Sequence, residues 1–207
     1  MTGKQFTLHY FDFHGGRGEV ARLVMYMAGV PFNDNRIGFA DWPAAKQTMP
    51  FLAVPVLEVN GEQISQSNAI NRYLGKMADL YPSDPLQALR CDEVMDAVED
   101  LVTKVVATFD MPDEERKLTR QQLCEGSFKQ YLERFEFLLS QRGGEHFADS
   151  RLTVADLKVF IWLRSLRSGV LDHIPTDLAD KYAPTLVQQF ETIEHLPKVQ
   201  SYYEQFQ

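Results

Sequence analysis

The chain has 207 residues, of which 44% are hydrophobic and 24% charged, as in an ordinary globular protein. A chain of this length buries roughly 70% of its unfolded surface, in one domain or two small ones. The formal net charge is −8 and no run of Lys and Arg occurs, which excludes the basic footprint of a nucleic-acid-binding protein and argues against anionic membranes as partners.

The first part of the chain predicts a strand, a helix and a second strand. Residues 6–11 are rich in aromatic and β-favouring side chains, which is typical of a strand. Glycines in 15–18 interrupt that pattern. Residues 19–28 then carry apolar side chains three and four positions apart, as in an amphipathic helix. Residues 32–37 predict the second strand, and because a helix separates the two strands we expect a parallel, right-handed βαβ unit.

A hairpin and another helix follow. Residues 56–59 and 62–65 predict strands, and Asn60-Gly61 between them is the strongest short turn signal, since both turn positions need a positive φ. Residues 68–77 predict a helix. The order β-α-β and then β-β-α predicts a thioredoxin-like α/β domain over residues 1–80.

The remaining chain is almost entirely helical. Tyr81-Pro82 and Asp84-Pro85 predict a linker at 81–85. Beyond the linker, helical patterns cover residues 86–109, 114–139, 153–166, 186–195 and 197–203. We therefore expect an α/β domain followed by an all-helical domain over 86–207.

Cysteines and the N-terminus bear on location. Cys91 and Cys124 form neither a CxxC pair nor a zinc spacing, which favours a reducing compartment. The chain enters its first strand without the basic and apolar segments of a secretory signal, and no apolar run approaches the ~20 residues of a membrane span. We expect a soluble cytoplasmic protein without a membrane partner.

Several strings, taken in order, resemble the cytosolic glutathione transferases. They are Leu8-His9-Tyr10-Phe11 with Arg17-Gly18-Glu19, Asp41-Trp42-Pro43 with Lys46, Val54-Pro55-Val56-Leu57, Gln66-Ser67-Asn68-Ala69-Ile70 and residues 150–156. The resemblance covers essentially the whole chain and favours the tyrosine type, its sigma class in particular. It implies that the α/β domain binds glutathione, as co-substrate, and that the helical domain contributes the electrophile site and the contacts of a homodimer.

Tyr10 is the predicted catalytic residue, together with Arg17. A tyrosine in a strand is by itself more often a packed aromatic, but Tyr10 ends its strand at the sheet edge where α/β proteins bind ligands. There a phenol can donate its hydroxyl to a thiolate, which lowers the pKa of the thiol and so produces the nucleophile. The resemblance places Arg17 near the sulfur. Because the stretch from Tyr10 to Arg17 is one residue longer than in the usual pattern, a partial role for His14 stays open.

The resemblance assigns seven residues to glutathione: Trp42, Lys46, Val54, Pro55, Gln66, Ser67 and Asp100. In it, Pro55 is cis and the backbone of Val54 pairs with the cysteinyl part. Lys46 and Trp42 contact the glycyl end. Gln66-Ser67 begin a helix, whose free N–H groups and dipole attract the γ-glutamyl carboxylate, while the plain alternative is that Ser67 only caps the helix.

The long helix over 86–109 carries two further predictions. Val94, Val98, Leu101 and Val105 form its buried stripe. Asp96, Glu99 and Asp100 share another face, which is usually only solvated. In the resemblance this helix lines a dimer two-fold, and Asp100 reaches the amine of the partner's glutathione. Farther on, Thr153 and Asp156 predict a capping box at the start of the helix over 153–166.

The predicted electrophile site is an aromatic cleft lined by Phe11, Phe13, Phe109 and Phe206. The preferred function is conjugation of glutathione to small apolar electrophiles, without a metal. Two alternatives stay open: a glutathione-dependent, prostaglandin-type isomerase, and a non-catalytic binding or structural protein with the same fold, as in some lens crystallins. A redox enzyme is disfavoured because no cysteine ends the first strand.

Overall fold

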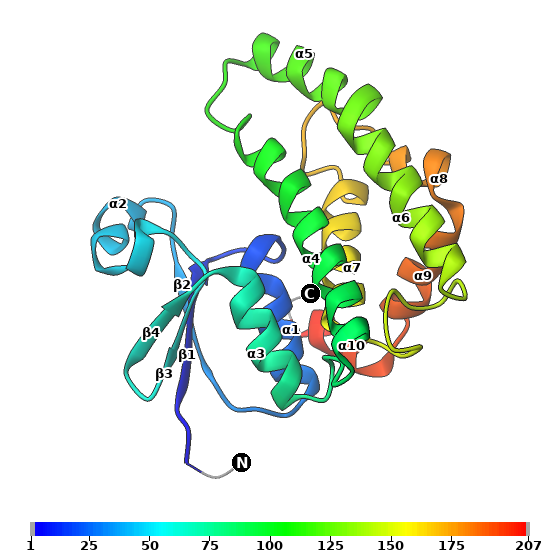
Figure 1. Cartoon of the computed structure of the whole chain (residues 1–207). Coiled ribbons are helices and arrows are strands. Elements are labelled where there is room, and N and C mark those ends of the chain that lie inside the picture. The colour runs from blue at the N-terminus through cyan, green and yellow to red at the C-terminus, as the bar shows by residue number, and fades with distance from the viewer. Residues whose placement is uncertain (1–2, 206–207) are drawn as a thin grey trace. The chain divides into compact units, whose positions relative to one another are not determined.

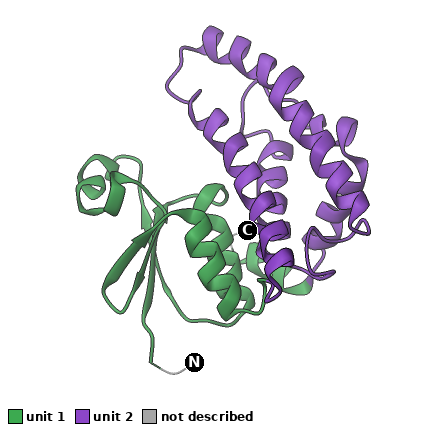
Figure 2. Cartoon of the chain, viewed as in Figure 1, with its two compact units in different colours: residues 1–81, 197–207 green, residues 82–196 purple. Residues whose placement is uncertain are grey.

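A computed structural model of the protein describes residues 3–205. The chain divides into two compact units, shown in different colours in Figure 2. Unit 1 comprises residues 1–81 and 197–207, and unit 2 comprises residues 82–196. The last helix, α10 (Pro197–Glu204), packs against α1 and belongs to unit 1, although its place in the chain predicts that it is part of the helical domain. The order of the elements along the sequence does not reveal that the chain returns to unit 1 at its end.

Unit 1 is built on a four-stranded sheet in the order β2-β1-β3-β4 (Figure 1). The strands are β1 (Phe6–Phe11), β2 (Asn33–Ile37), β3 (Val56–Val59) and β4 (Glu62–Ser65). β1 is parallel to β2 and antiparallel to β3, and β3 and β4 form the hairpin. The predicted parallel βαβ unit and the Asn-Gly hairpin are therefore confirmed.

Two long helices cover this sheet. α1 (Gly16–Met27) and α3 (Ser67–Met77) pack against each other and against the strands, as Figure 1 shows. α1 begins at Gly16, three residues earlier than predicted, and its first turn contains Gly18 despite the low helix propensity of glycine. A short α2 (Trp42–Ala45) and two 3₁₀ turns, Lys46–Thr48 and Pro50–Leu52, connect β2 to β3 and were not predicted.

Unit 2 contains α4 (Pro85–Val106), α5 (Asp113–Leu123), α6 (Lys129–Gln141), α7 (Val154–Arg167), α8 (Leu178–Tyr182) and α9 (Pro184–Glu194). Pro85, predicted as the end of the linker, is instead the first residue of α4, a position that suits its fixed φ and missing N–H. The Asp84 side chain caps this helix by accepting from the N–H groups of Leu86 and Gln87, at 3.1 and 2.9 Å. α4 ends at Val106, three residues before the predicted end, and its predicted apolar stripe is buried.

The long helical pattern predicted over 114–139 is confirmed, with one difference: a π-helical turn, Cys124–Phe128, lies between α5 and α6. Buried side chains recur there at Arg120, Cys124, Phe128 and Leu132, three successive intervals of four. In an α-helix of 3.6 residues per turn this spacing drifts around the axis, and a wider π turn reduces the drift.

The core of unit 2 lies around α7, which is buried along nearly its whole length and packs against α4. α8 was not predicted; it is short and precedes α9. Within the described part of the chain, none of the helices combines the length and the apolar character that crossing a bilayer requires.

Candidate active site

The register of the sheet brings the predicted residues of unit 1 to one edge. β3 begins at Val56, which is paired with His9 near the end of β1. Ser65, the last residue of β4, is paired with Val56 in turn. The parallel strand β2 also ends here, since Ile37 is paired with Phe11. The same edge therefore gathers the predicted catalytic tyrosine and the predicted glutathione residues of this unit: Tyr10, Trp42, Lys46, Val54, Pro55, Gln66 and Ser67.

The Tyr10 hydroxyl is held by the first turn of α1. The side chain is buried, and its oxygen accepts the backbone N–H of Arg17 at 2.9 Å. Burial raises the pKa of Tyr10, against the lowering effects of the backbone N–H groups of Arg17 and Gly18 and of the Arg17 charge. Tyr10 therefore stays protonated at neutral pH. Because the oxygen accepts from the backbone, the hydroxyl hydrogen remains available for another acceptor.

Glycines allow this close approach of α1 to Tyr10. A Cβ at Gly16 would lie 2.4 Å from the Tyr10 hydroxyl oxygen, and a Cβ at Gly18 would lie 2.3 Å from Cγ of the same ring. Gly16 also has a φ of +66°, a backbone conformation that residues other than glycine rarely adopt. The glycine-rich string thus serves the contact with Tyr10.

Arg17 and His14 differ in their surroundings. Arg17 is half-buried, and its charge acts on Tyr10. His14 contacts Glu19 through a hydrogen bond, with Nδ1 3.1 Å from Oε1. The His14 ring also makes edge contacts with Tyr202 and Tyr203 of α10. The structure therefore connects His14 to α1 and α10.

A buried ion pair, Glu19 and Arg22, underlies the site and was missed by sequence reasoning. The two residues are 0% and 1% exposed, and Arg22 Nη1 lies 3.3 Å from Glu19 Oε2. The Arg22 guanidinium also lies 5.5 Å from the centroid of the Tyr10 ring. Its Nε bonds both carboxylate oxygens of Asp34, at 3.0 and 3.1 Å. The sequence carried no signal for this pair, because Glu19 and Arg22 have the spacing of an ordinary solvated i, i+3 ion pair.

The residues of unit 1 that are predicted to bind glutathione have different environments. Trp42 packs on the small core cluster around Met49, which supports a structural role beside any binding role. The side-chain ammonium of Lys46 has no hydrogen-bond or ion-pair partner among residues 3–205. The Val54–Pro55 peptide bond is cis, as expected.

At the start of α3, Gln66 occupies the N-cap position with a φ of 77°, and its side chain makes no capping hydrogen bond. Ser67 follows as the first helical residue and is buried.

Aromatic rings form an exposed surface beside Tyr10. Phe11 and Phe13 stack with Phe39, with ring centroids 5.0 and 6.1 Å from it, and Phe39 is 69% exposed. Sequence reasoning missed Phe39, although a phenylalanine two residues before Asp41-Trp42, after the end of a predicted strand, was a usable signal. Of the other predicted electrophile residues, Phe109 is an exposed residue of unit 2, and Phe206 lies outside the described residues.

The predicted acidic face of α4 is not uniformly solvated. Asp100 is exposed and accepts the hydroxyl of Tyr131 at 3.0 Å. Glu99 instead pairs with the buried ammonium of Lys158, at 3.0 Å. Within residues 3–205, no three side chains of His, Cys, Asp or Glu cluster so that they could hold a metal ion.

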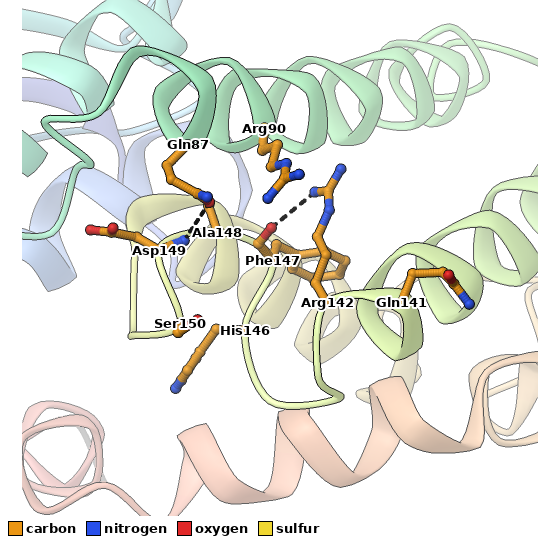
Figure 3. A pocket seen from close by; sticks show the side chains of 9 residues that line it. All are labelled: Gln87, Arg90, Gln141, Arg142, His146, Phe147, Ala148, Asp149 and Ser150. Atoms are coloured by element: carbon orange, nitrogen blue, oxygen red, sulfur yellow. Dashed lines mark hydrogen bonds between the residues drawn. The ribbon is translucent and has the colours of Figure 1, made fainter.

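A polar pocket of about 120 Å³ in unit 2 contains none of the predicted residues (Figure 3). Arg142 lines it and donates to the carbonyl of Phe147 at 2.9 Å and to Glu93 at 2.7 Å. The amide oxygen of Gln87 accepts the N–H of Asp149 at 2.9 Å. These hydrogen bonds hold the segment before α7 against α4, so we assign the pocket a structural role.

Comparison with known protein families gives two matches in consecutive order. "Glutathione S-transferase, N-terminal domain" matches residues 6–76, and "Glutathione S-transferase, C-terminal domain" matches residues 99–205. Glutathione S-transferase 1 of Ascaris suum is 33% identical over 204 residues, covering 96% of this chain and 95% of that protein. Hematopoietic prostaglandin D synthase of Gallus gallus is 32% identical over 194 residues, covering 94% and 92%. S-crystallin 2 of Octopus vulgaris is 30% identical over 177 residues, covering 77% and 80%.

Solved structures agree with these relatives. The prostaglandin synthase D of Nilaparvata lugens superposes with a TM-score of 0.87 at 33% identity and covers 97% of both chains. A sigma class glutathione transferase of Fasciola hepatica superposes with a TM-score of 0.83 at 27% identity, covering 98% of this chain and 96% of the other. The thioredoxin-like and helical domains predicted from the sequence are thereby confirmed. With a matching domain at each end and relatives that span nearly its whole length, the chain belongs to the glutathione S-transferase family, whose co-substrate is glutathione.

Proposed function

We propose that this protein conjugates glutathione to small apolar electrophiles and that Tyr10 activates the thiol. The observation that supports this role is the Tyr10 hydroxyl, which accepts a backbone N–H of α1 and keeps its own hydrogen for another acceptor. A hydrogen bond from this hydroxyl to a thiolate contributes about 1.5–3 kcal/mol. Since one pKa unit corresponds to about 1.4 kcal/mol, the bond lowers the pKa of the thiol by roughly one to two units.

Glutathione would lie along the sheet edge. The start of α3 at Gln66-Ser67 receives the γ-glutamyl carboxylate, because its N–H groups and helix dipole favour an anion. The backbone of Val54 pairs with the cysteinyl part. Lys46 pairs with the glycyl carboxylate, and its lack of an ammonium partner among the described residues supports this assignment. Trp42 covers the glycyl end.

In the proposed reaction the thiol proton leaves to solvent, and the thiolate is stabilised by the Tyr10 hydroxyl and by the positive charge of Arg17. The sulfur then forms a bond to the electrophilic carbon, whose bond to the leaving group breaks. The half-buried rings of Phe11 and Phe13 and the exposed ring of Phe39 favour flat, apolar electrophiles beside the sulfur. Phe109 and Phe206 retain their expected place in the electrophile site as part of this proposal.

Replacement of Tyr10 by Phe tests the proposal. Only the hydroxyl is removed, so we expect turnover with an aryl halide to fall while the KM for glutathione stays nearly unchanged. The bound thiol should regain an ordinary pKa of about 8.5. Thiolate absorbance titrated against pH in both proteins measures this. An unchanged thiol pKa would assign the activation to another group, such as Arg17.

A prostaglandin-type isomerase is the second candidate, favoured by the similarity to two proteins named prostaglandin D synthase. Incubation with a prostaglandin endoperoxide distinguishes it, because isomerisation consumes no glutathione and conjugation does. Retention on immobilised glutathione without turnover of either substrate would support the non-catalytic alternative.

The proposal includes a homodimer with shared active sites, in which Asp100 binds the γ-glutamyl ammonium in the partner subunit. Asp100 is exposed on α4, and the same helix exposes Leu86 and Leu89 at helical spacings from it. Apolar side chains exposed along one face of a helix favour an interface on that face. A cytoplasmic location, as expected from the sequence, belongs to the same proposal.

A further inference from the structure

One buried ion pair holds the segment that joins β1 to α1. Arg22 donates through Nη2 to the carbonyl of Phe11 at 3.0 Å and through Nη1 to the carbonyl of Phe13 at 2.9 Å. The same guanidinium pairs with Glu19. The backbone directly after Tyr10 is thereby tied at two points to a charge pair that solvent does not reach.

His14 supplies a third point. Its Nδ1 lies 3.1 Å from Glu19 Oε1, and because a carboxylate only accepts, Nδ1 carries the hydrogen. The same oxygen accepts the hydroxyl of Tyr202 at 3.1 Å. Burial and the charge of Glu19 raise the pKa of Tyr202, so this hydroxyl stays a donor. The His14 ring also makes edge contacts with Tyr202 and Tyr203, with centroids 6.3 and 6.4 Å away.

These contacts lie close in sequence to the hydrogen bond that holds Tyr10. The Arg17 N–H donor follows His14 by three residues, and the two residues between them are Gly15 and Gly16, with φ values of 122° and 66°. Glycine imposes little conformational preference of its own. The position of this segment therefore depends on the residues at its ends, His14 on one side and α1 on the other.

We infer that His14 is a positioning residue of the active site, which ties the β1–α1 segment to Glu19 and to α10 and so keeps the Arg17 N–H on the Tyr10 oxygen. The consequence for turnover rests on the proposed role of Tyr10. Through Tyr202, the last helix of the chain takes part in setting the geometry of the first strand's catalytic tyrosine.

Hydrogen exchange of the Arg17 and Gly18 amides tests this positioning directly. In His14→Ala and in Tyr202→Phe we expect exchange about tenfold faster than in the unaltered protein, the factor that one lost hydrogen bond contributes. His14→Asn places an amide N–H near the position of Nδ1–H and should restore most of the protection. In the same variants kcat should fall more than the KM for glutathione changes, because the binding residues at α3 and Lys46 are untouched.

Tyr26→Phe is the matched control. It removes another hydrogen bond between α1 and α10, from the Tyr26 hydroxyl to Ser201 at 3.2 Å, without touching Glu19. We expect exchange at Arg17 and Gly18 to be unchanged in this variant. Equal acceleration in Tyr26→Phe would show a general loosening of α10 and would overturn the inference, as would unchanged exchange in both His14→Ala and Tyr202→Phe.

The exchange result is independent of the chemistry assigned to Tyr10. If Tyr10→Phe leaves the thiol pKa unaltered while His14→Ala accelerates exchange, the proposed activation fails and the positioning stands. If Tyr10→Phe raises the thiol pKa while exchange in His14→Ala and Tyr202→Phe matches the unaltered protein, the activation stands and the positioning fails.

Discussion

At the scale of single residues, Tyr10 shows how a buried phenol is prepared for donation. Its ring is packed like that of a core tyrosine, but its oxygen faces the first turn of α1 and accepts a backbone N–H. A buried tyrosine usually satisfies itself by donating to a protein acceptor. Here the backbone supplies a donor, so the hydroxyl hydrogen is left for another acceptor. The raised pKa of Tyr10 keeps that hydrogen in place at neutral pH.

Gly16→Ala should damage this arrangement. The new Cβ would lie 2.4 Å from the Tyr10 oxygen, and the residue would keep a φ of +66°. We expect a loss of about 1–3 kcal/mol in the free energy of unfolding and a larger loss of turnover, since the hydroxyl must move. Urea denaturation and aryl halide turnover measure the two effects.

Gly29→Ala is the control for Gly16→Ala. Gly29 has a similar φ of +64°, but a Cβ there meets no atom within 4 Å. This variant should cost about 1–2 kcal/mol of stability from backbone strain and leave turnover per folded molecule intact. Equal turnover in the two variants would contradict the close contact between Gly16 and Tyr10.

At the scale of elements, the start of α7 carries more than the predicted capping box. Asp156 Oδ2 accepts the N–H and the hydroxyl of Thr153, both at 2.7 Å, which confirms the predicted contact. Oδ1 accepts the N–H of Phe147 and the side-chain amide of Gln189, both at 2.9 Å. Asp156 is fully buried, and α7 is the central helix of unit 2. One carboxylate thus joins the cap, the preceding segment and α9.

Asp156→Asn should therefore destabilise the protein strongly. An amide has only one oxygen, so its NH₂ group would face two of the four donors. We expect the free energy of unfolding to fall by roughly 2–4 kcal/mol, which combines a lost cap with a buried unsatisfied donor. Thr153→Ser keeps the hydroxyl and serves as the control, with a much smaller change. A loss for Asp156→Asn no greater than that for Thr153→Ser in urea denaturation would show that the network is dispensable.

At the scale of the whole molecule, the proposed dimer makes a prediction about Asp100. If its carboxylate binds the ammonium of the partner's glutathione, Asp100→Asn should raise the KM for glutathione more than it lowers turnover. The loss corresponds to about 1–3 kcal/mol, as for a charged group left without its partner. Asp96→Asn removes a charge one turn earlier on α4 and should leave KM unchanged.

Sedimentation completes this test, because the dimer should have about twice the 23.8 kDa mass of the chain. A fully active monomer would refute the shared site. So would an Asp100→Asn variant whose KM equals that of the unaltered protein.

The sequence by itself determined the fold class, the family and the order of the main strands and helices, but not the short helices α2 and α8 or the π-helical turn. Alternation in 6–11, the Asn60-Gly61 turn and the apolar stripe of α4 are local patterns, and local patterns report local backbone geometry. The catalytic candidate Tyr10 was found in the same way, because strand ends and glycine-rich bends are visible in a linear chain.

Only the tertiary structure decided how the candidate site is supported. The Glu19–Arg22 pair, the docking of α10 on α1 and the stacking of Phe39 on Phe11 all join residues that are brought together by folding. In a linear pattern Glu19 and Arg22 resemble a solvated i, i+3 pair, and their burial follows from the elements that pack around them. Burial and partners depend on the assembled chain, so the sequence revealed the candidate catalytic residue and the structure revealed what holds it.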